Sequence, residues 1–228
     1  MEIVATGVEV IGAHGPLLAP TSLRVADGQT LLVTGEAGTG KTALALALSG
    51  RLKPSAGSVR LDGSADADVL RRAVTVVDAP QITEPDEALQ VRDVVAEGLS
   101  LAGRRSTRRK VRDWLAEREL RGDVRFENLP AHQRTRLLID LACESRTTRA
   151  LVLDCPDRHG HDPQNWYSPA TARAADGMAV IVLCSTHSAD ELGAPAVRIG
   201  ANDTESESTE KSDDTQNPGK TRKSTSVR

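Results

Sequence analysis

The sequence predicts an α/β fold built around a parallel sheet that is buried on both faces. Along residues 1–200, short apolar runs alternate with stretches that favour helices, and strands that alternate with helices are typical of a parallel sheet. Apolar residues make up 39% of the chain, but aromatic residues make up only 2%. The core must therefore consist of Leu, Val, Ile and Ala, which suits strands covered on both faces.

The expected strands are short apolar runs bounded by turn residues, and they are 31–34, 58–61, 74–77, 151–153, 180–183 and 197–199. The expected helices have good helix formers or apolar residues at helical spacing, and they are 42–48, 91–101, 111–120, 132–144 and a stretch near 171–175. A chain of 228 residues suggests one domain, with or without a small subdomain.

Residues 201–228 differ in composition from everything before them. They are almost all Ser, Thr, Asp, Glu, Lys and Asn, and Val227 is their only large apolar residue. Such a segment cannot bury enough apolar surface to offset the entropy of ordering. We therefore expect a folded domain over residues 1–200 and a disordered polar tail over residues 201–228.

Net charge and cysteine content restrict the partners and the compartment. The net charge is −3 and the pI is near 6.0, so we expect no nucleic acid partner. Cys143, Cys155 and Cys184 are far apart and form no CxxC pair, which favours reduced thiols in the cytosol. The sequence contains no signal pattern and no apolar run of the roughly 20 residues that cross a bilayer. We expect a cytoplasmic protein that reaches a membrane through a partner.

A glycine-rich loop carries the strongest chemical signal. Its residues fit G-x-x-x-x-G-K-[ST], and they are Gly35, Glu36, Ala37, Gly38, Thr39, Gly40, Lys41 and Thr42. The loop lies between an expected strand and an expected helix, which is the context that a phosphate-binding loop requires. The glycines let backbone N–H groups surround a phosphate, and the helix directs its positive end at the same anion. Lys41 would reach the β- and γ-phosphates, and Thr42 would bind magnesium.

Asp154 is the candidate magnesium partner of this loop. It ends the apolar run Leu151–Leu153, and a carboxylate at the end of a buried strand needs a cation or a hydrogen-bond donor. The alternative is an aspartate that only caps a turn. The next residue is Cys155, where many nucleotide hydrolases have a glutamate that activates water.

These motifs, in this order, resemble the ATP-binding subunit of ABC transporters over about residues 1–200. The segments that carry the resemblance, besides the glycine-rich loop and Asp154, are 22–25, 27–29, 54–63, 78–81, 129–134, 160–162 and 185–187. The sequence has no Asn-Lys-x-Asp motif to read guanine, so ATP is expected rather than GTP.

The resemblance implies a P-loop core sheet of the ABC type, a small antiparallel β subdomain and a helical subdomain at about 82–148. It implies that Gln81 contacts magnesium and attacking water, and that His187 contacts the γ-phosphate, so both would act in catalysis. Thr42, Gln81 and Asp154 would hold Mg²⁺. The helical subdomain would dock a membrane permease subunit at the inner face of the cell membrane. Two ATP-binding subunits would pair as a homodimer or heterodimer.

Three departures from the family pattern weaken the expected catalysis. Cys155 replaces the glutamate, and losing a general base costs roughly 10²–10⁴ in rate. Pro130, Ala131 and His132 replace the serine and glycines of the family signature, and proline offers no N–H to a phosphate. His14 stands near the place of the aromatic that stacks on adenine. We expect ATP binding with weak hydrolysis, and the alternative is a non-hydrolysing ATP-binding regulatory module.

Overall fold

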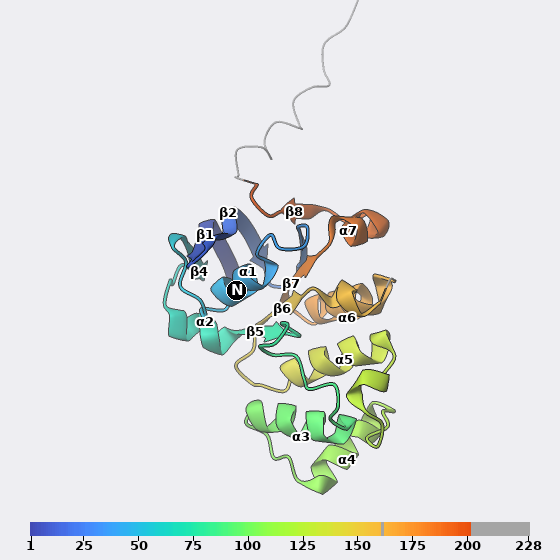
Figure 1. The fold of residues 1–228 in the computed structure, drawn as a ribbon. Coiled ribbons are helices and arrows are strands. Elements are labelled where there is room, and N and C mark those ends of the chain that lie inside the picture. The colour runs from blue at the N-terminus through green and yellow to red at the C-terminus, as the bar shows by residue number, and fades with distance from the viewer. Residues whose placement is uncertain (161, 202–228) are drawn as a thin grey trace, which may run out of the picture.

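The computed structural model describes residues 1–160 and 162–201, which form two sheets and their covering helices (Figure 1). The expected tail therefore lies outside the described residues, apart from Ala201. One sheet is antiparallel with strand order β2-β1-β4, and the other is parallel with order β5-β6-β7-β3-β8. The α/β class and the small antiparallel sheet predicted above are confirmed.

The strands are β1 (Glu2–Gly12), β2 (Gly15–Ala26), β3 (Thr30–Thr34), β4 (Ala56–Leu61), β5 (Val74–Val77), β6 (Ala150–Asp154), β7 (Ala179–Cys184) and β8 (Ala196–Arg198). The helices are α1 (Lys41–Leu48), α2 (Ala67–Ala73), α3 (Val91–Leu101), α4 (Arg108–Glu117), α5 (Ala131–Ala142), α6 (Gln164–Ala175) and α7 (Thr186–Leu192). Two short 3₁₀ turns are η1 (Phe126–Asn128) and η2 (Pro156–His159).

Helix α1 packs between the two sheets. Its Leu44 and Leu48 share one buried cluster with Ile3 of the antiparallel sheet and with Val152 and Ile181 of the parallel sheet. The other face of the parallel sheet is covered by α5 and α6, whose buried side chains join a second cluster. Two apolar clusters thus hold the central strands on both faces, as the near absence of polar residues in β6 and β7 predicts.

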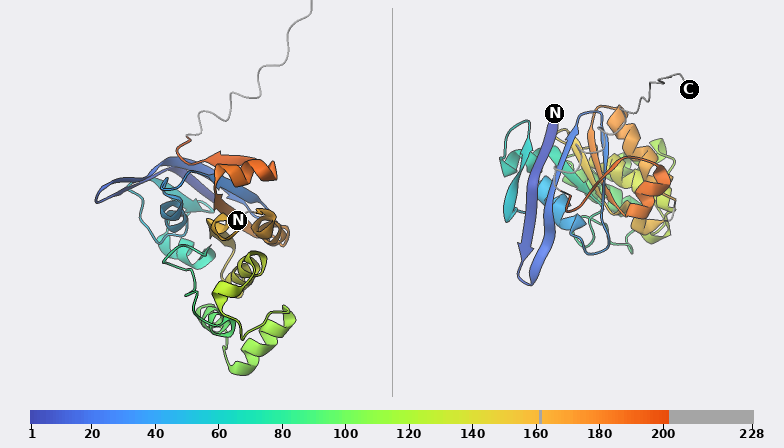
Figure 2. Two further views of the ribbon diagram at one scale, coloured as in Figure 1. Left: turned by 45° about the vertical axis from the view of Figure 1, so that its right-hand side comes forward. Right: turned by 90° about the horizontal axis from the view of Figure 1, so that it is seen from above.

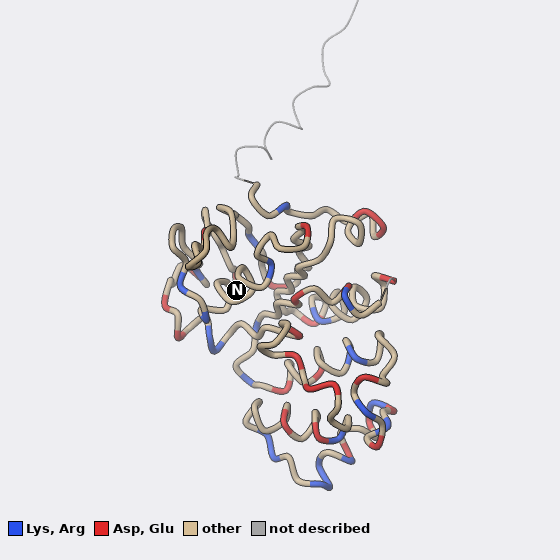
Figure 3. The backbone as a smooth tube through the Cα atoms, in the orientation of Figure 1, with Lys and Arg blue, Asp and Glu red and all other residues tan. Residues whose placement is uncertain are grey.

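Helices α3 and α4 lie below α5, away from the strands (Figures 1 and 2). Their apolar faces pack on one another, and α3 also packs on α5. Figure 3 shows Lys and Arg gathered at the α3–α4 connection, with Asp and Glu close by on the same helices. None of the helices within residues 1–160 and 162–201 is long and apolar enough to span a bilayer.

The expected elements match the structure in type but not always in extent. Helix α4 begins at Arg108 because the Thr107 hydroxyl caps it by accepting from the Lys110 N–H at 3.4 Å. The run of basic residues there hid the start of the helix from a search for apolar periodicity. Helix α6 begins at Gln164 and continues through Pro169, whereas the expected stretch began only near residue 171. Helices α2 and α7 were not predicted, since each is only 7 residues long.

A buried carboxylate joins three helices beside the parallel sheet. Asp140 of α5 has a side chain only 7% exposed. Its Oδ2 accepts from Arg118 Nε at 3.1 Å, and its Oδ1 accepts from Arg173 Nη2 at 2.9 Å. Arg118 caps the carboxyl end of α4 and Arg173 lies on α6, so this carboxylate connects both helices to α5.

Asp140→Ala should lower the free energy of unfolding by about 2–3 kcal/mol, because it leaves two guanidinium groups without their buried partner. Urea unfolding followed by circular dichroism measures the change. The matched control is Asp113→Ala, since Asp113 is 43% exposed and lies 3.7 Å from both Arg109 and Arg112. The control should stay within about 0.5 kcal/mol of the wild type. Equal losses in both variants would contradict the assignment.

Candidate functional site

The loops predicted to form the site meet at the carboxyl edge of the parallel sheet. Strand β7 lies between β6, which ends in Asp154, and β3, which leads into the glycine-rich loop. The Gly35 N–H donates to the Cys184 carbonyl at 3.3 Å, and the Cys155 N–H donates to the Leu183 carbonyl at 2.9 Å. The end of β7 thus fixes the glycine-rich loop on one side and the residue after Asp154 on the other.

The glycine-rich loop has the backbone geometry of an anion cradle. Gly38 and Gly40 adopt φ values of 81° and 92°, a left-handed region that other residues rarely enter. A Cβ on Gly40 would lie 2.0 Å from the Leu17 carbonyl oxygen, so only glycine fits beneath β2. Lys41 Nζ donates to the carbonyls of Gly35 at 2.5 Å and Glu36 at 2.9 Å. The ammonium group is therefore held against the loop at the start of α1.

Asp154 is fully buried at the end of β6. Its Oδ1 accepts from the Cys155 thiol at 3.2 Å, whereas its Oδ2 has no hydrogen-bond partner among the described residues. Thr42 is the second residue of α1, and α1 packs against β6. A buried carboxylate with an open oxygen needs a cation, and carboxylate, hydroxyl and phosphate oxygens are the ligands that Mg²⁺ prefers. The residues present fit a magnesium ion at this edge.

Cys155 follows Asp154, at the position where the resemblance implies a glutamate. Its φ of 54° is left-handed, and it turns the chain out of β6. Burial, and next the Asp154 carboxylate beside it, raise the pKa of the Cys155 thiol to about 12. The thiol is therefore protonated at neutral pH and donates to Asp154. It cannot accept a proton from water.

Asp157, two residues after Cys155, is also engaged. Its Oδ2 accepts from the Ser185 N–H at 2.8 Å and from the Ser188 hydroxyl at 3.1 Å. These bonds fasten the turn η2 to the amino end of α7, where the Ser185 hydroxyl also accepts from the Ser188 N–H. Asp157 therefore positions the segment 185–187 and is not a free carboxylate.

The segment 185–187 lies beside the glycine-rich loop, since Thr186 Oγ1 donates to Glu36 Oε1 at 3.5 Å. The His187 side chain is 89% exposed, and its Nε2 lies 3.9 Å from Glu191 of the same helix. The structure thus brings the backbone of this segment to the loop but leaves the imidazole at the surface.

Gln81 lies in a tight loop after β5. The Ala79 carbonyl accepts from the N–H groups of Ile82, Thr83 and Glu84 at 3.0–3.1 Å. Gln81 is exposed and has a φ of 59°. Within the described part of the chain, neither Gln81 nor His187 donates a side-chain hydrogen bond to residues 35–42.

The segment 129–134, where the resemblance implies the family signature, includes the start of α5. Pro130 caps α5 without a side-chain hydrogen bond, and His132 is exposed. A Cβ on Gly160 would lie 3.1 Å from the Ala131 Cβ, so the turn after β6 approaches this helix closely. His14 is exposed in the turn between β1 and β2. His161, part of the segment 160–162 that carries the resemblance, lies outside the described residues.

A charged cluster that was not predicted from the sequence joins the Gln81 loop to the turn after Asp154. Arg158 Nη1 donates to the Asp78 carbonyl at 2.6 Å and to the Asp154 carbonyl at 2.9 Å. Arg158 Nη2 donates to Glu84 at 2.9 Å, and His159 Nε2 lies 2.8 Å from Asp78 Oδ2. The sequence signal that could have predicted this cluster is Asp78, a carboxylate directly after a buried strand. Two possible cationic partners, Arg158 and His159, lie in the turn after the neighbouring strand.

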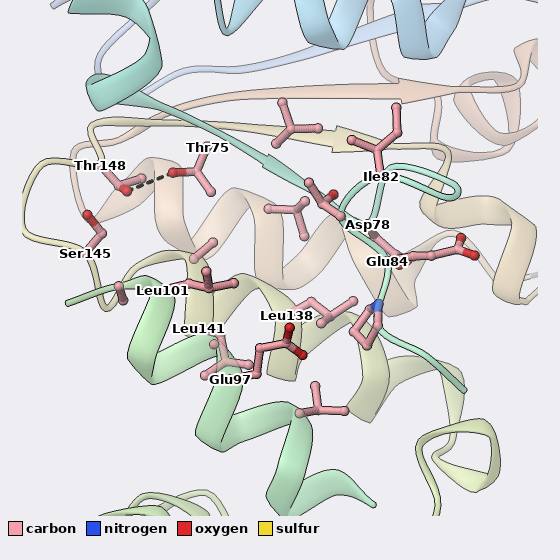
Figure 4. Close-up of a pocket in the computed structure, with 18 of the residues that line it drawn as sticks. Thr75, Asp78, Ile82, Glu84, Glu97, Leu101, Leu138, Leu141, Ser145 and Thr148 are labelled. Atoms are coloured by element: carbon pink, nitrogen blue, oxygen red, sulfur yellow. Dashed lines mark hydrogen bonds between the residues drawn. The ribbon is translucent and has the colours of Figure 1, made fainter. Parts of the chain in front are cut away.

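A groove of about 610 Å³ lies between β5, its following loop, α3 and α5. Figure 4 shows Asp78, Ile82 and Glu84 at one end, with Leu101 of α3 and Leu141 of α5 along the helical wall. Leu101 is 83% exposed and Ile82 is 51% exposed. Both side chains offer apolar surface to a segment that would dock in the groove.

The three thiols should make the free energy of unfolding fall as pH rises above about 8.5. Burial raises the pKa of Cys143 to about 11 and those of Cys155 and Cys184 to about 12, while unfolded thiols titrate near 8.5. The folded state keeps them neutral, so this share of stability is present below about pH 8.5 and is lost as pH rises toward the folded values. In Cys155→Ser, the fall in unfolding free energy between about pH 8 and 10 should be smaller than in wild type by about 2 kcal/mol. Urea unfolding at each pH measures it, and identical slopes would contradict the assignment.

Known proteins with similar sequences show which family this chain belongs to. A family model described as ABC transporter matches residues 18–156. The chain is 32% identical over 161 residues to the taurine import ATP-binding protein TauB of Pseudomonas syringae, covering 68% of this chain and 60% of that protein. It is 41% identical over 64 residues to the hemin import ATP-binding protein HmuV of Myxococcus xanthus, covering 28% of this chain and 24% of that protein. The chain thus spans about 60% of the length of its taurine-import relatives.

Solved structures show the same fold at lower identity. A putative ABC transporter ATP-binding protein from Pyrococcus furiosus superposes with a TM-score of 0.65 at 19% identity, covering 87% of this chain and 96% of that one. A nucleotide-free ATP-binding cassette from an ABC transporter gives a TM-score of 0.63 at 17% identity, covering 88% and 90%. The chain belongs to the ABC transporter family, and its fold is that of an ATP-binding domain of this family.

Proposed function

We propose that this chain binds magnesium ATP and couples it to a membrane permease, with weak hydrolysis. The observation that carries the proposal is the open oxygen of Asp154, fully buried at the sheet edge where the glycine-rich loop also begins. An uncompensated buried carboxylate is costly, and a metal ion bound with a phosphate would remove that cost.

Each predicted residue has a role in this proposal. The backbone N–H groups of residues 35–42 cradle the phosphates, and Lys41 leaves the loop carbonyls to bind them. Thr42, Gln81 and Asp154 hold Mg²⁺, which supplies charge neutralisation of the phosphate oxygens when bound. Gln81 and His187, both exposed, reach the γ-phosphate and its attacking water after the site closes.

Two features support weak turnover. The Cys155 thiol is neutral and donates its proton to Asp154, so it cannot serve as the general base. Pro130 brings no N–H to the amino end of α5, where the family signature would bind the partner subunit's nucleotide. In a homodimer both nucleotide sites carry both defects. In a heterodimer with a second ATP-binding subunit, each site carries one.

The groove beside α3 supports a permease partner. Its walls come from the helical region at about 82–148 and from the loop of Gln81, so a segment docked there would touch the loop that reaches the nucleotide. The relatives are named for taurine and hemin import, and import requires a permease. A cytoplasmic chain at the inner face of the membrane follows from such a partner.

The second candidate is a regulatory module that binds ATP without hydrolysing it. The neutral Cys155 thiol favours it, because a thiol that keeps its proton cannot serve as the general base. The presence of Lys41, Gln81 and His187 together favours transport. A permease that stays with the chain through purification would support transport, and a soluble partner held only with ATP would support regulation.

Binding of a fluorescent ATP analogue, titrated with and without Mg²⁺, tests the site. Lys41→Ala should weaken binding by about tenfold or more, since charge-assisted hydrogen bonds contribute about 1.5–3 kcal/mol. Asp154→Asn should bind the metal-free analogue normally but lose the strengthening by Mg²⁺. Lys53→Ala, at an exposed lysine after α1, is the control and should bind as wild type does. Unchanged binding in Lys41→Ala would overturn the phosphate-loop assignment.

Steady-state ATP hydrolysis by the purified chain tests the role of Cys155. Cys155→Glu should raise kcat by about 10²-fold, because it restores a carboxylate base. Cys155→Ser keeps a small, neutral side chain and should not change the rate. Rapid hydrolysis by the wild type, or no gain in Cys155→Glu with ATP binding intact, would show that the missing base does not limit turnover.

A further inference from the structure

Arg158 joins the carboxyl ends of two neighbouring parallel strands. Strands β5 and β6 pair in register, with Val77 opposite Leu153. Asp78 follows Val77, and Asp154 follows Leu153. The carbonyls of these two aspartates accept hydrogen bonds from the same guanidinium nitrogen, Arg158 Nη1, at 2.6 and 2.9 Å. One planar side chain therefore fixes the separation of the two chain segments where they leave the sheet.

The second nitrogen of the guanidinium reaches the far end of the Gln81 loop. Arg158 Nη2 donates to Glu84 Oε2 at 2.9 Å and forms an ion pair with Asp78 Oδ1 at 3.0 Å. His159 contacts the other oxygen of Asp78. Arg158 thus contacts both the first and the last residue of the loop 78–84, with Gln81 midway between them.

Most of the cluster is shielded from water, and its outer member, Glu84, is 31% exposed. The side chains of Asp78, His159 and Arg158 are 6%, 14% and 24% exposed. Charge-assisted hydrogen bonds are stronger in such surroundings than at the surface. Asp78 and Gln81 both adopt left-handed backbone angles, with φ values of 62° and 59°, which persist only where neighbouring contacts hold them.

The loop held by Arg158 also forms part of the groove wall. Asp78, Ile82 and Glu84 line the groove, as Figure 4 shows. The Asp154 carbonyl, on the other side of Arg158, belongs to the residue whose carboxylate has the open oxygen. Arg158 is therefore in contact with the groove loop and with the residue that would hold the metal.

We propose that Arg158 is a positioning residue that couples the groove to the nucleotide site. It makes the loop 78–84 and the turn after Asp154 move together, so that nucleotide bound at one side shifts Gln81 and the groove wall at the other. The inference rests on the proposed function for its ligand, magnesium ATP. It goes beyond that function by assigning the coupling to one side chain.

A reporter in the groove separates coupling from binding. Ile82 is 51% exposed and lies on the held loop, so Ile82→Cys accepts a maleimide fluorophore sensitive to polarity. The native thiols react slowly at pH 7 because burial raises the pKa of each of them. Titration with magnesium ATP then gives two readouts from one chain, namely the fluorescence change at residue 82 and the dissociation constant from a separate binding assay.

With Arg158 present, magnesium ATP should shift the emission of the label. Arg158→Met should keep the dissociation constant within about threefold while the emission shift falls by about tenfold, since coupling and affinity are separate free energies. Arg158→Lys keeps a donor for the two carbonyls and should restore part of the shift. Glu84→Gln leaves Arg158 and its carbonyl contacts in place, and it should reduce the shift without unfolding the chain.

Arg121→Met is the matched control, because Arg121 pairs with Asp123 at 2.9 Å on an exposed turn away from both sites. It should leave affinity and emission shift unchanged. A full emission shift in Arg158→Met, an equal loss in Arg121→Met, or ATP binding without any shift in the chain with Arg158 would each overturn the coupling. If the chain with Arg158 does not bind ATP at all, the proposed function fails first and the coupling fails with it.

Discussion

The buried end of β7 is the constraint on which the rest of the site depends. Residues 179–184 are all buried at 0% exposure, so the last carbonyls of this strand must find donors from the protein. They find them in Gly35 and Cys155, the first residues to leave the neighbouring strands. Satisfying two carbonyl groups therefore sets where the glycine-rich loop begins and where β6 turns away.

Three carboxylates near this edge have three different environments. Asp154 keeps an open oxygen, Asp157 caps α7, and Asp78 is held between Arg158 and His159. The remaining candidate group, the thiol of Cys155, is neutral. The edge is thus equipped to attract a cation and to fix its own loops.

Much of this arrangement follows from local sequence signals. Apolar runs bounded by turns predicted the parallel strands, and the glycine spacing predicted the loop that leads into α1. Local signals could not predict features that depend on contacts with residues elsewhere in the chain. The start of α4 depends on a Thr107 cap within a polar run, and the length of α6 depends on packing that tolerates Pro169. The exposure of His187 and the contacts of Arg158 arise from turns that meet only after the strands have paired.

The contact between Gly40 and Leu17 makes the two sheets parts of one binding surface. The backbone of β2 leaves no room for a side chain at Gly40. The hairpin therefore lies directly against the start of α1. The hairpin tip looks like a surface loop that could vary freely in length. Strand β2 nevertheless limits where the backbone of the glycine-rich loop can lie, so an insertion upstream of Leu17 would also shift a loop that leaves the other sheet. Variation in this hairpin is limited by a backbone-to-backbone distance and not by side-chain chemistry.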